Sequence, residues 1–318
     1  HDQSSTRDTA IEVAAQALLH GQNAWNVNIG VPVTTGPTSI LLAIPFVILF
    51  GEINWLSFCF WLVFFLVLLL CDIYYRNNTW PTLIMIFMLG SFGFVHTLYW
   101  SLEELYYPIL YLALAYFLVK RNLWLVGSLL AACVLSRISY VFMVFGFGLW
   151  YLFSFQFNWQ SILKIGLGFV LGSVVILLPF VIIGGKSFWS NNALRLAFDM
   201  SASSYPNSNF VFQALNQLNV QIGAGAMRFV KLGLTTIVMC ATACGLQRAK
   251  VHHPFWHITI GSLLAHTLVW CNGALPNDYV LIFVLPAMLA IAMITYNNLD
   301  DPRNLTNTGR KPGKATRK

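Results

Sequence analysis

Apolar runs long enough to cross a membrane dominate the chain from residue 53 to residue 296. An apolar helix of about 20 residues spans the hydrocarbon core of a bilayer, because a helix satisfies its own backbone hydrogen bonds there. The pattern predicts an all-α polytopic membrane protein with about nine transmembrane helices, at residues 53–75, 80–99, 102–119, 123–139, 140–156, 160–185, 228–246, 254–271 and 278–296. Ionisable groups are expensive inside such a domain, so those that persist mark ion pairs, pathways or sites.

Two shorter segments precede these runs. The first is an amphipathic helix from about Asp8 to Gly21, predicted by apolar residues at helical spacing: Ala10, Val13, Ala14, Ala17 and Leu18. The second, residues 39–51, is apolar but too short to cross and contains Pro45, which favours an interfacial or re-entrant segment. Residues 1–52 are therefore expected to form a first loop that carries surface helices.

The distribution of charge orients the predicted helices. Residues 297–318 form a basic tail, which the positive-inside rule places in the cytoplasm, and counting back through nine spans puts residues 1–52 outside. Residues 186–227 then form a long extracytoplasmic loop. Six basic residues in cytoplasmic connectors and six in the tail make 12 of the 18 basic residues inside. Eight of the 11 acids fall outside: Asp2, Asp8, Glu12, Glu52, Glu103, Glu104, Asp199 and Asp278.

Composition narrows the possible partners and cofactors. Hydrophobic residues make up 58% and charged residues 9% of the chain, which is typical of a membrane domain. The net charge of +7 comes largely from the tail, which can contact anionic lipid, so no nucleic-acid partner is implied. No Cys/His spacing typical of a zinc site occurs. We therefore expect no metal or cofactor. Asp2, Asp8 and Glu103 could share a divalent cation, but their spacing in the sequence does not support such a site.

Acidic residues at two places are candidates for catalysis. Asp8, next to Arg7, begins the first predicted helix, where an acid can also simply complement the helix dipole. Glu103 and Glu104 lie on an outer hairpin. Glu104 has the S-x-x-E spacing of a capping box with Ser101, whereas Glu103 is not needed for that box.

Residues at two other outer helix ends are candidates for substrate binding. Arg137 lies at the outer end of an apolar run, where an arginine either reaches for lipid headgroups or offers a planar fork to a phosphate. Asp278 and Tyr279 open the last run, where a helix N-cap and an interfacial tyrosine are the local alternatives.

Taken in order, these segments resemble the GT-C glycosyltransferases, in particular the relatives of protein O-mannosyltransferases and aminoarabinose transferases. The family pattern "RD…A…ll.G..pY" has counterparts in Arg7-Asp8, Ala15, Leu18-Leu19, Gly21 and Trp25. The pattern "KPPl…lfG" has counterparts in Gly36-Pro37-Thr38 and Leu49-Phe50-Gly51. The runs from Gly127 to Arg137 and from Asp278 to Pro286 resemble two later family segments. The usual lysine before the double proline, which lies close to the lipid-linked phosphate in the family, is absent here, and Trp25 replaces a tyrosine.

The resemblance implies an inverting transfer on the outer face of the cell membrane. The donor would be a sugar carried on polyprenyl phosphate, and the acceptor a glycan, a lipid or a protein. Asp8 would act as general base, with Glu103 or Glu104 as a second acid, while Arg137 would contact the donor phosphate. Arg7, Asp278 and Tyr279 would complete the substrate site. An N-terminus that is predicted outside with no preceding span also suggests that the chain starts late and lacks a first transmembrane helix.

A secondary transporter or lipid flippase is the alternative function. Gly and Pro interrupt several of the predicted helices, as they do in transporters. The acids, however, gather at one face rather than at the midplane, and the two halves of the chain show no internal repeat. We therefore favour the glycosyltransferase.

Overall fold

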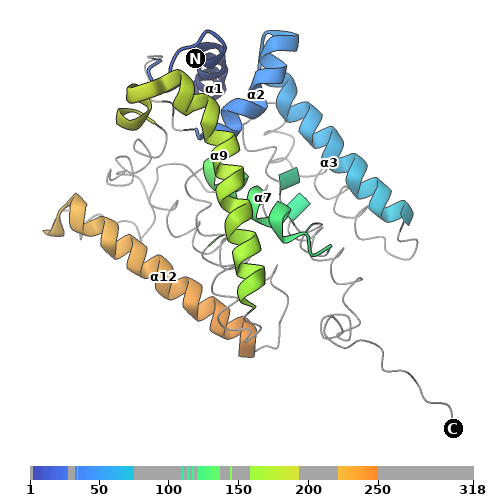
Figure 1. Cartoon of the computed structure of the whole chain (residues 1–318), viewed down its shortest axis with the longest axis vertical. Coiled ribbons are helices and arrows are strands. Elements are labelled where there is room, and N and C mark those ends of the chain that lie inside the picture. The colour runs from blue at the N-terminus through green and yellow to red at the C-terminus, as the bar shows by residue number, and fades with distance from the viewer. Residues whose placement is uncertain are drawn as a thin grey trace.

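The structure is a computed structural model that describes residues 3–27, 33, 35–74, 109–110, 113–114, 117, 120–136, 144, 158–192 and 221–248. These residues form helices joined by turns and contain no β-strand, so the all-α prediction is confirmed for them. Figure 1 labels the six helices, which are α1 (Gln3–Leu19), α2 (Pro37–Phe50), α3 (Asn54–Tyr74), α7 (Leu123–Ser136), α9 (Trp159–Ser190) and α12 (Ala224–Arg248).

The predicted apolar runs coincide with helices wherever the structure describes them. Helix α3 coincides with the predicted run 53–75 to within one residue at each end. Helices α9 and α12 contain the predicted runs 160–185 and 228–246. Among the described helices, α9 alone is long and apolar enough to cross a membrane on length and composition. The runs 80–99, 102–119, 140–156, 254–271 and 278–296 lie outside the described residues, apart from isolated positions. The number of nine spans therefore stays a prediction.

Helix α1 ends as its sequence predicts but begins earlier. Gly21 adopts a left-handed conformation with φ of 73°, and the Gln22 N–H donates to the Ala17 carbonyl at 2.8 Å, which closes the helix. The first helical residue is Gln3, so Asp8 lies in the second turn. The interpretation of Asp8 as the acid at the start of this helix is wrong, and a role in complementing the helix terminus loses its basis.

Helix α2 is a separate short helix, as its length and Pro45 predict. Pro37 occupies its first turn, where a missing N–H costs nothing, and Gly51 ends it with φ of 75° and an N–H bond to the Val47 carbonyl at 3.0 Å. Its 14 residues extend about 21 Å, less than the thickness of a hydrocarbon core. The Glu12 side chain of α1 then accepts from the Ile53 N–H at 3.4 Å, at the point where α3 begins.

Helices α7 and α9 cross at glycines and run in the same direction. A Cβ on Gly168 would overlap the Trp124 carbonyl oxygen, and a Cβ on Gly172 would lie 2.8 Å from the Ser128 Cα. A step of four residues toward the C-terminus of α9, from Gly168 to Gly172, thus matches a step of four toward the C-terminus of α7, from Trp124 to Ser128. The two helices are therefore parallel. The Ser128 hydroxyl donates to the Gly168 carbonyl at 3.0 Å, a bond between helices that the close approach permits.

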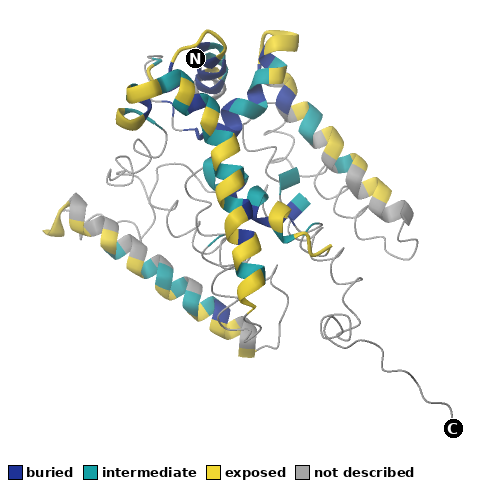
Figure 2. Cartoon of the chain, in the orientation of Figure 1, coloured by how far each residue is buried: buried dark blue, intermediate teal, exposed yellow. Residues whose placement is uncertain are grey.

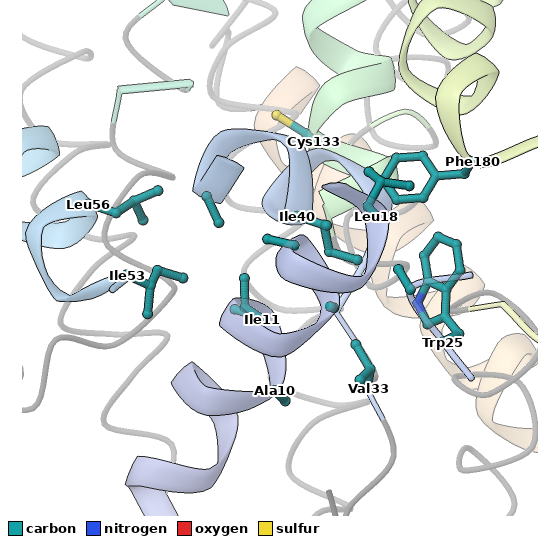
Figure 3. Close-up of a cluster of buried hydrophobic side chains, with 14 of the residues drawn as sticks. Ala10, Ile11, Leu18, Trp25, Val33, Ile40, Ile53, Leu56, Cys133 and Phe180 are labelled. Carbon is teal, nitrogen blue, oxygen red and sulfur yellow. The ribbon is translucent and has the colours of Figure 1, made fainter. Parts of the chain in front are cut away.

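The buried core lies where α1 and α2 meet the C-terminal ends of α7 and α9. Its largest fully buried side chains are Phe180, Ile11, Ile40 and Leu56. Figure 2 shows buried residues concentrated on α1 and α2, whereas α3 and α9 carry many exposed ones. Figure 3 shows Trp25 beside Phe180 at one edge of this core, and the two ring centroids are 5.0 Å apart.

Candidate functional site

The N-terminus of α2 is joined directly to the C-terminus of α7. The Gly36 N–H donates to the Ser136 carbonyl at 2.9 Å, and the Ser39 hydroxyl approaches the same oxygen at 3.4 Å. Only glycine fits at position 36, because a Cβ there would overlap the Leu135 carbonyl oxygen. The negative end of one helix dipole thereby meets the positive end of another.

This junction gathers most of the buried polar side chains in the described part of the chain. They are Thr35, Thr38, Ser39 and Ser136. The other buried polar side chain, Asn23, lies in the turn after α1. Thr38 Oγ1 is buried and has no hydrogen-bond partner there, which is unusual because a buried hydroxyl without a partner is costly. Gly36 has no side chain to cap α2 either. The first turn of α2 thus carries an unpaired hydroxyl donor at a helix end whose dipole is already matched by that of α7.

Arg137 follows Ser136 directly in the chain, although it lies outside the described residues. The last described residue before it, Ser136, is hydrogen-bonded to Gly36 at the N-terminus of α2. The segment that ends at Ser136 and the segment that begins at Gly36 therefore meet at this junction.

Helix α1 brings Asp8 to the same half of the molecule, because α1 packs along α2 and both contribute to the buried core. Asp8 lies one helical turn before Glu12, whose carboxylate marks the start of α3. Arg7 precedes it on α1. The side chains of Arg7 and Asp8 are not among those described, so which way they point stays a prediction.

The turn after α1 is fastened to the C-terminal end of α9. Asn23 Nδ2 donates to Ser187 Oγ at 2.9 Å, and Asn191 Nδ2 donates to the Trp25 carbonyl at 2.7 Å. The Trp25 indole N–H donates to the Thr35 carbonyl at 3.2 Å, which connects this turn to the segment before α2. One set of hydrogen bonds thus links the first loop to the ends of both α7 and α9.

The remaining predicted site residues cannot be compared with the structure. Glu103, Glu104, Arg137, Asp278 and Tyr279 all lie outside the described residues. Their meeting with Asp8 in one site therefore stays a prediction. In the described ranges, no group of three His, Cys, Asp or Glu side chains is arranged to hold a metal ion.

Sequence reasoning missed three residues that fasten this region together: Asn23, Ser136 and Asn191. Each acts through a partner about 97 to 168 positions away in the chain. No periodicity or spacing in a single sequence reports such a pairing. Comparison with protein-family models, with curated proteins and with solved structures finds no match for this chain.

Proposed function

We propose that this chain is an integral membrane glycosyltransferase of GT-C type in the cell membrane, with about nine transmembrane helices. It takes a sugar from a polyprenyl-phosphate donor and transfers it to a glycan, lipid or protein acceptor on the extracytoplasmic face. The hydrogen bond between Gly36 and Ser136 carries this proposal. It joins the segment before α2 to the residue before Arg137, two segments that the family resemblance independently associates with the donor phosphate.

The chemistry of the junction suits an anion. Thr38 contributes an unpaired hydroxyl donor that can bind a phosphate oxygen, whereas the N-terminus of α2 already faces the C-terminal carbonyls of α7 and adds little positive field. Arg137 would add a planar, permanently charged fork that can bind two phosphate oxygens at once. Together these groups offer an alternative to the lysine that is absent before Pro37.

The exposed surface of the long helices supports a location within a bilayer. Eight aliphatic residues of α9 are exposed: Leu163, Leu167, Val170, Leu171, Val174, Val175, Leu178 and Ile182. An apolar stripe of this extent is not stable in water unless something covers it. The exposed tryptophans in the described ranges lie near the ends of apolar helices, as in interfacial aromatic belts: Trp55, Trp124, Trp159 and Trp189.

The shared direction of α7 and α9 supports the predicted topology. Ser136 and Asn158 lie at opposite ends of the helix pair, as a span predicted at 140–156 between them requires. The first loop binds the C-terminal ends of both helices, which favours a site at one membrane face. The described residues include no buried charged side chain, so nothing in them favours the transporter.

The proposed reaction is a single displacement. The acceptor hydroxyl attacks the anomeric carbon, the bond from that carbon to the phosphate oxygen breaks, and polyprenyl phosphate leaves with the electron pair. Asp8 accepts the hydroxyl proton as the new bond forms. The anomeric configuration is inverted. Purified protein should therefore release polyprenyl phosphate from labelled polyprenyl-phosphate sugars in the presence of an acceptor, and a complete absence of turnover across the common sugars would argue against the proposal.

Replacing Arg137 by leucine should weaken binding of a polyprenyl-phosphate sugar by about 10- to 100-fold, because hydrogen bonds to charged groups contribute about 1.5–3 kcal/mol. Arg137→Lys keeps the charge but loses the fork, so its loss should be smaller. Equilibrium binding of the labelled donor measures both. Lys164→Leu, which removes an exposed basic residue near the other end of the α7–α9 pair, is the control and should bind normally. Unchanged affinity in Arg137→Leu would make Arg137 a headgroup anchor.

The topology can be checked with single cysteines and a membrane-impermeant thiol reagent. Cysteines in the loop 186–227 should react from outside, and cysteines in the tail 297–318 only after the inside is exposed. The basis is the excess of basic residues on the predicted cytoplasmic side. Labelling of both regions from the same side would contradict the number or the orientation of the spans.

A further inference from the structure

Helix α9 bends sharply near its C-terminal end, at a residue that has to be glycine. Gly185 has φ of 51° and ψ of −129°, a conformation that residues with a Cβ rarely adopt. Its Cβ position is open, so the restriction comes from the backbone and not from crowding. Pro179, six residues earlier, cannot donate a hydrogen bond to the preceding turn. The end of α9 therefore has two weak points close together.

The bend folds the last turn of α9 around Trp25. Phe180 precedes the bend and lies 5.0 Å from the Trp25 ring, and Phe188 follows the bend and lies 5.9 Å from it in an edge-on arrangement. All three side chains are buried. In a straight α9 the two phenylalanines would lie about 12 Å apart along the helix axis, so keeping both rings on one indole favours the bend.

Neutral hydrogen bonds hold the bent position. We call Asn23, Ser187 and Asn191 the amide latch. Asn23 Nδ2 donates to Ser187 Oγ at 2.9 Å, and Ser187 Oγ donates in turn to the Gly184 carbonyl at 2.7 Å, next to the bend. Asn191 Nδ2 donates to the Trp25 carbonyl at 2.7 Å and to Asn26 Oδ1 at 3.0 Å. No member of the amide latch is ionisable, so it should hold over a wide range of pH.

We infer that Gly185 is the hinge of a two-position element and that the amide latch keeps it bent. In the second position Gly185 is helical, α9 is straight, and residues 186–192 leave Trp25. The hinge thereby sets where Asn192 lies relative to the turn that follows α1. Such bistable elements are usual where a few residues near a helix end absorb a large change in φ and ψ. This inference does not depend on the glycosyltransferase activity.

Spin labels at the two ends of α9 test the hinge directly. Trp159 and Trp189 are both exposed, and an unbent helix would separate them by about 45 Å. Each is replaced by cysteine in a full-length chain that lacks the six native cysteines, and the distance is measured by pulsed electron resonance. In the protein with the native amide latch, the distance between the labels at positions 159 and 189 should have one value, clearly below about 45 Å. Gly185→Ala should shift the distribution toward 45 Å, because alanine disfavours the bent backbone.

Three controls separate bending from general damage. Gly166→Ala is the matched control, because its Cβ also enters open space but Gly166 is helical, and it should leave the distance unchanged. A label pair at Trp159 and Val175 precedes the bend and should not move in any variant. Asn191→Ala alters no backbone requirement, so it keeps the test valid if Gly185→Ala fails to fold, and it should broaden the distribution toward longer distances.

The inference is overturned if Gly185→Ala gives the native distance, since Gly185 would then not be a hinge. It is also overturned if Asn191→Ala leaves the distribution as narrow as in the native chain, since the amide latch would then not hold the bend.

Discussion

Replacing Gly168 by leucine should destabilise the protein by at least about 3 kcal/mol, because a tightly packed crossing cannot accommodate a large side chain without moving a helix. Even the first added carbon would overlap the Trp124 carbonyl oxygen and lie 2.9 Å from the carbonyl carbon, both of which are backbone atoms. The Ser128 bond to the Gly168 carbonyl would be lost as the helices separate. Thermal unfolding of the detergent-solubilised protein should show a large fall in Tm.

Gly166→Leu is the matched control for this prediction. Gly166 lies two residues earlier on the same helix, is exposed, and has nothing within 4 Å of its Cβ position. A leucine there would join the exposed apolar stripe, so Tm should stay within a few degrees of the native value. Equal losses of Tm in Gly166→Leu and Gly168→Leu would contradict the close crossing of α7 and α9.

The positions of the helices could be predicted because the signals are local. The length of each apolar run predicted α3, α9 and α12 to within a few residues at most ends. Glycine signalled the ends of α1 and α2, since Gly21 and Gly51 both adopt the left-handed conformation that closes a helix. The start of α1 was harder, because residues 3–7 have no apolar periodicity and yet continue the helix.

The contacts between segments could not be predicted, because they depend on residues far apart in the chain. Gly36 looks like an ordinary residue before a proline, and nothing in its neighbourhood points to Ser136, a hundred positions later. The predicted run ended at Gly185, but the sequence did not show that the helix continues to Ser190 beyond a bend there. The bend becomes understandable only once Phe180 and Phe188 are known to share Trp25.

The candidate site depends both on local sequence signals, which could be predicted, and on contacts between distant segments, which could not. The residue types that suit phosphate and acid–base chemistry, Arg137 and Asp8, were chosen from local surroundings in the sequence. The structure adds that the chain positions next to them belong to one half of the molecule, since α1 packs on α2 and α2 is bound to Ser136. The outer hairpin with Glu103 lies outside the described residues, so the second acid rests on the sequence alone.

Asp8→Asn should leave folding and donor binding intact but lower the rate of sugar transfer by at least about 10²-fold, the usual effect of removing a general base. Asparagine has nearly the same shape as aspartate but cannot accept the acceptor's proton. Because Asp8 lies in the second turn of α1, a loss of helix capping does not provide a competing explanation. The measurements are single-turnover transfer from a labelled polyprenyl-phosphate sugar, donor affinity and Tm.

Glu12→Gln provides the control for Asp8→Asn on the same helix. Glu12 lies one turn later and accepts from the Ile53 N–H, and the amide oxygen of glutamine can accept the same bond, so transfer should change by less than about threefold. If Asp8→Asn keeps near-native turnover while Glu103→Gln is inactive, the base lies on the second loop. If neither substitution slows transfer, these acids are not the catalytic groups and the glycosyltransferase proposal fails with them.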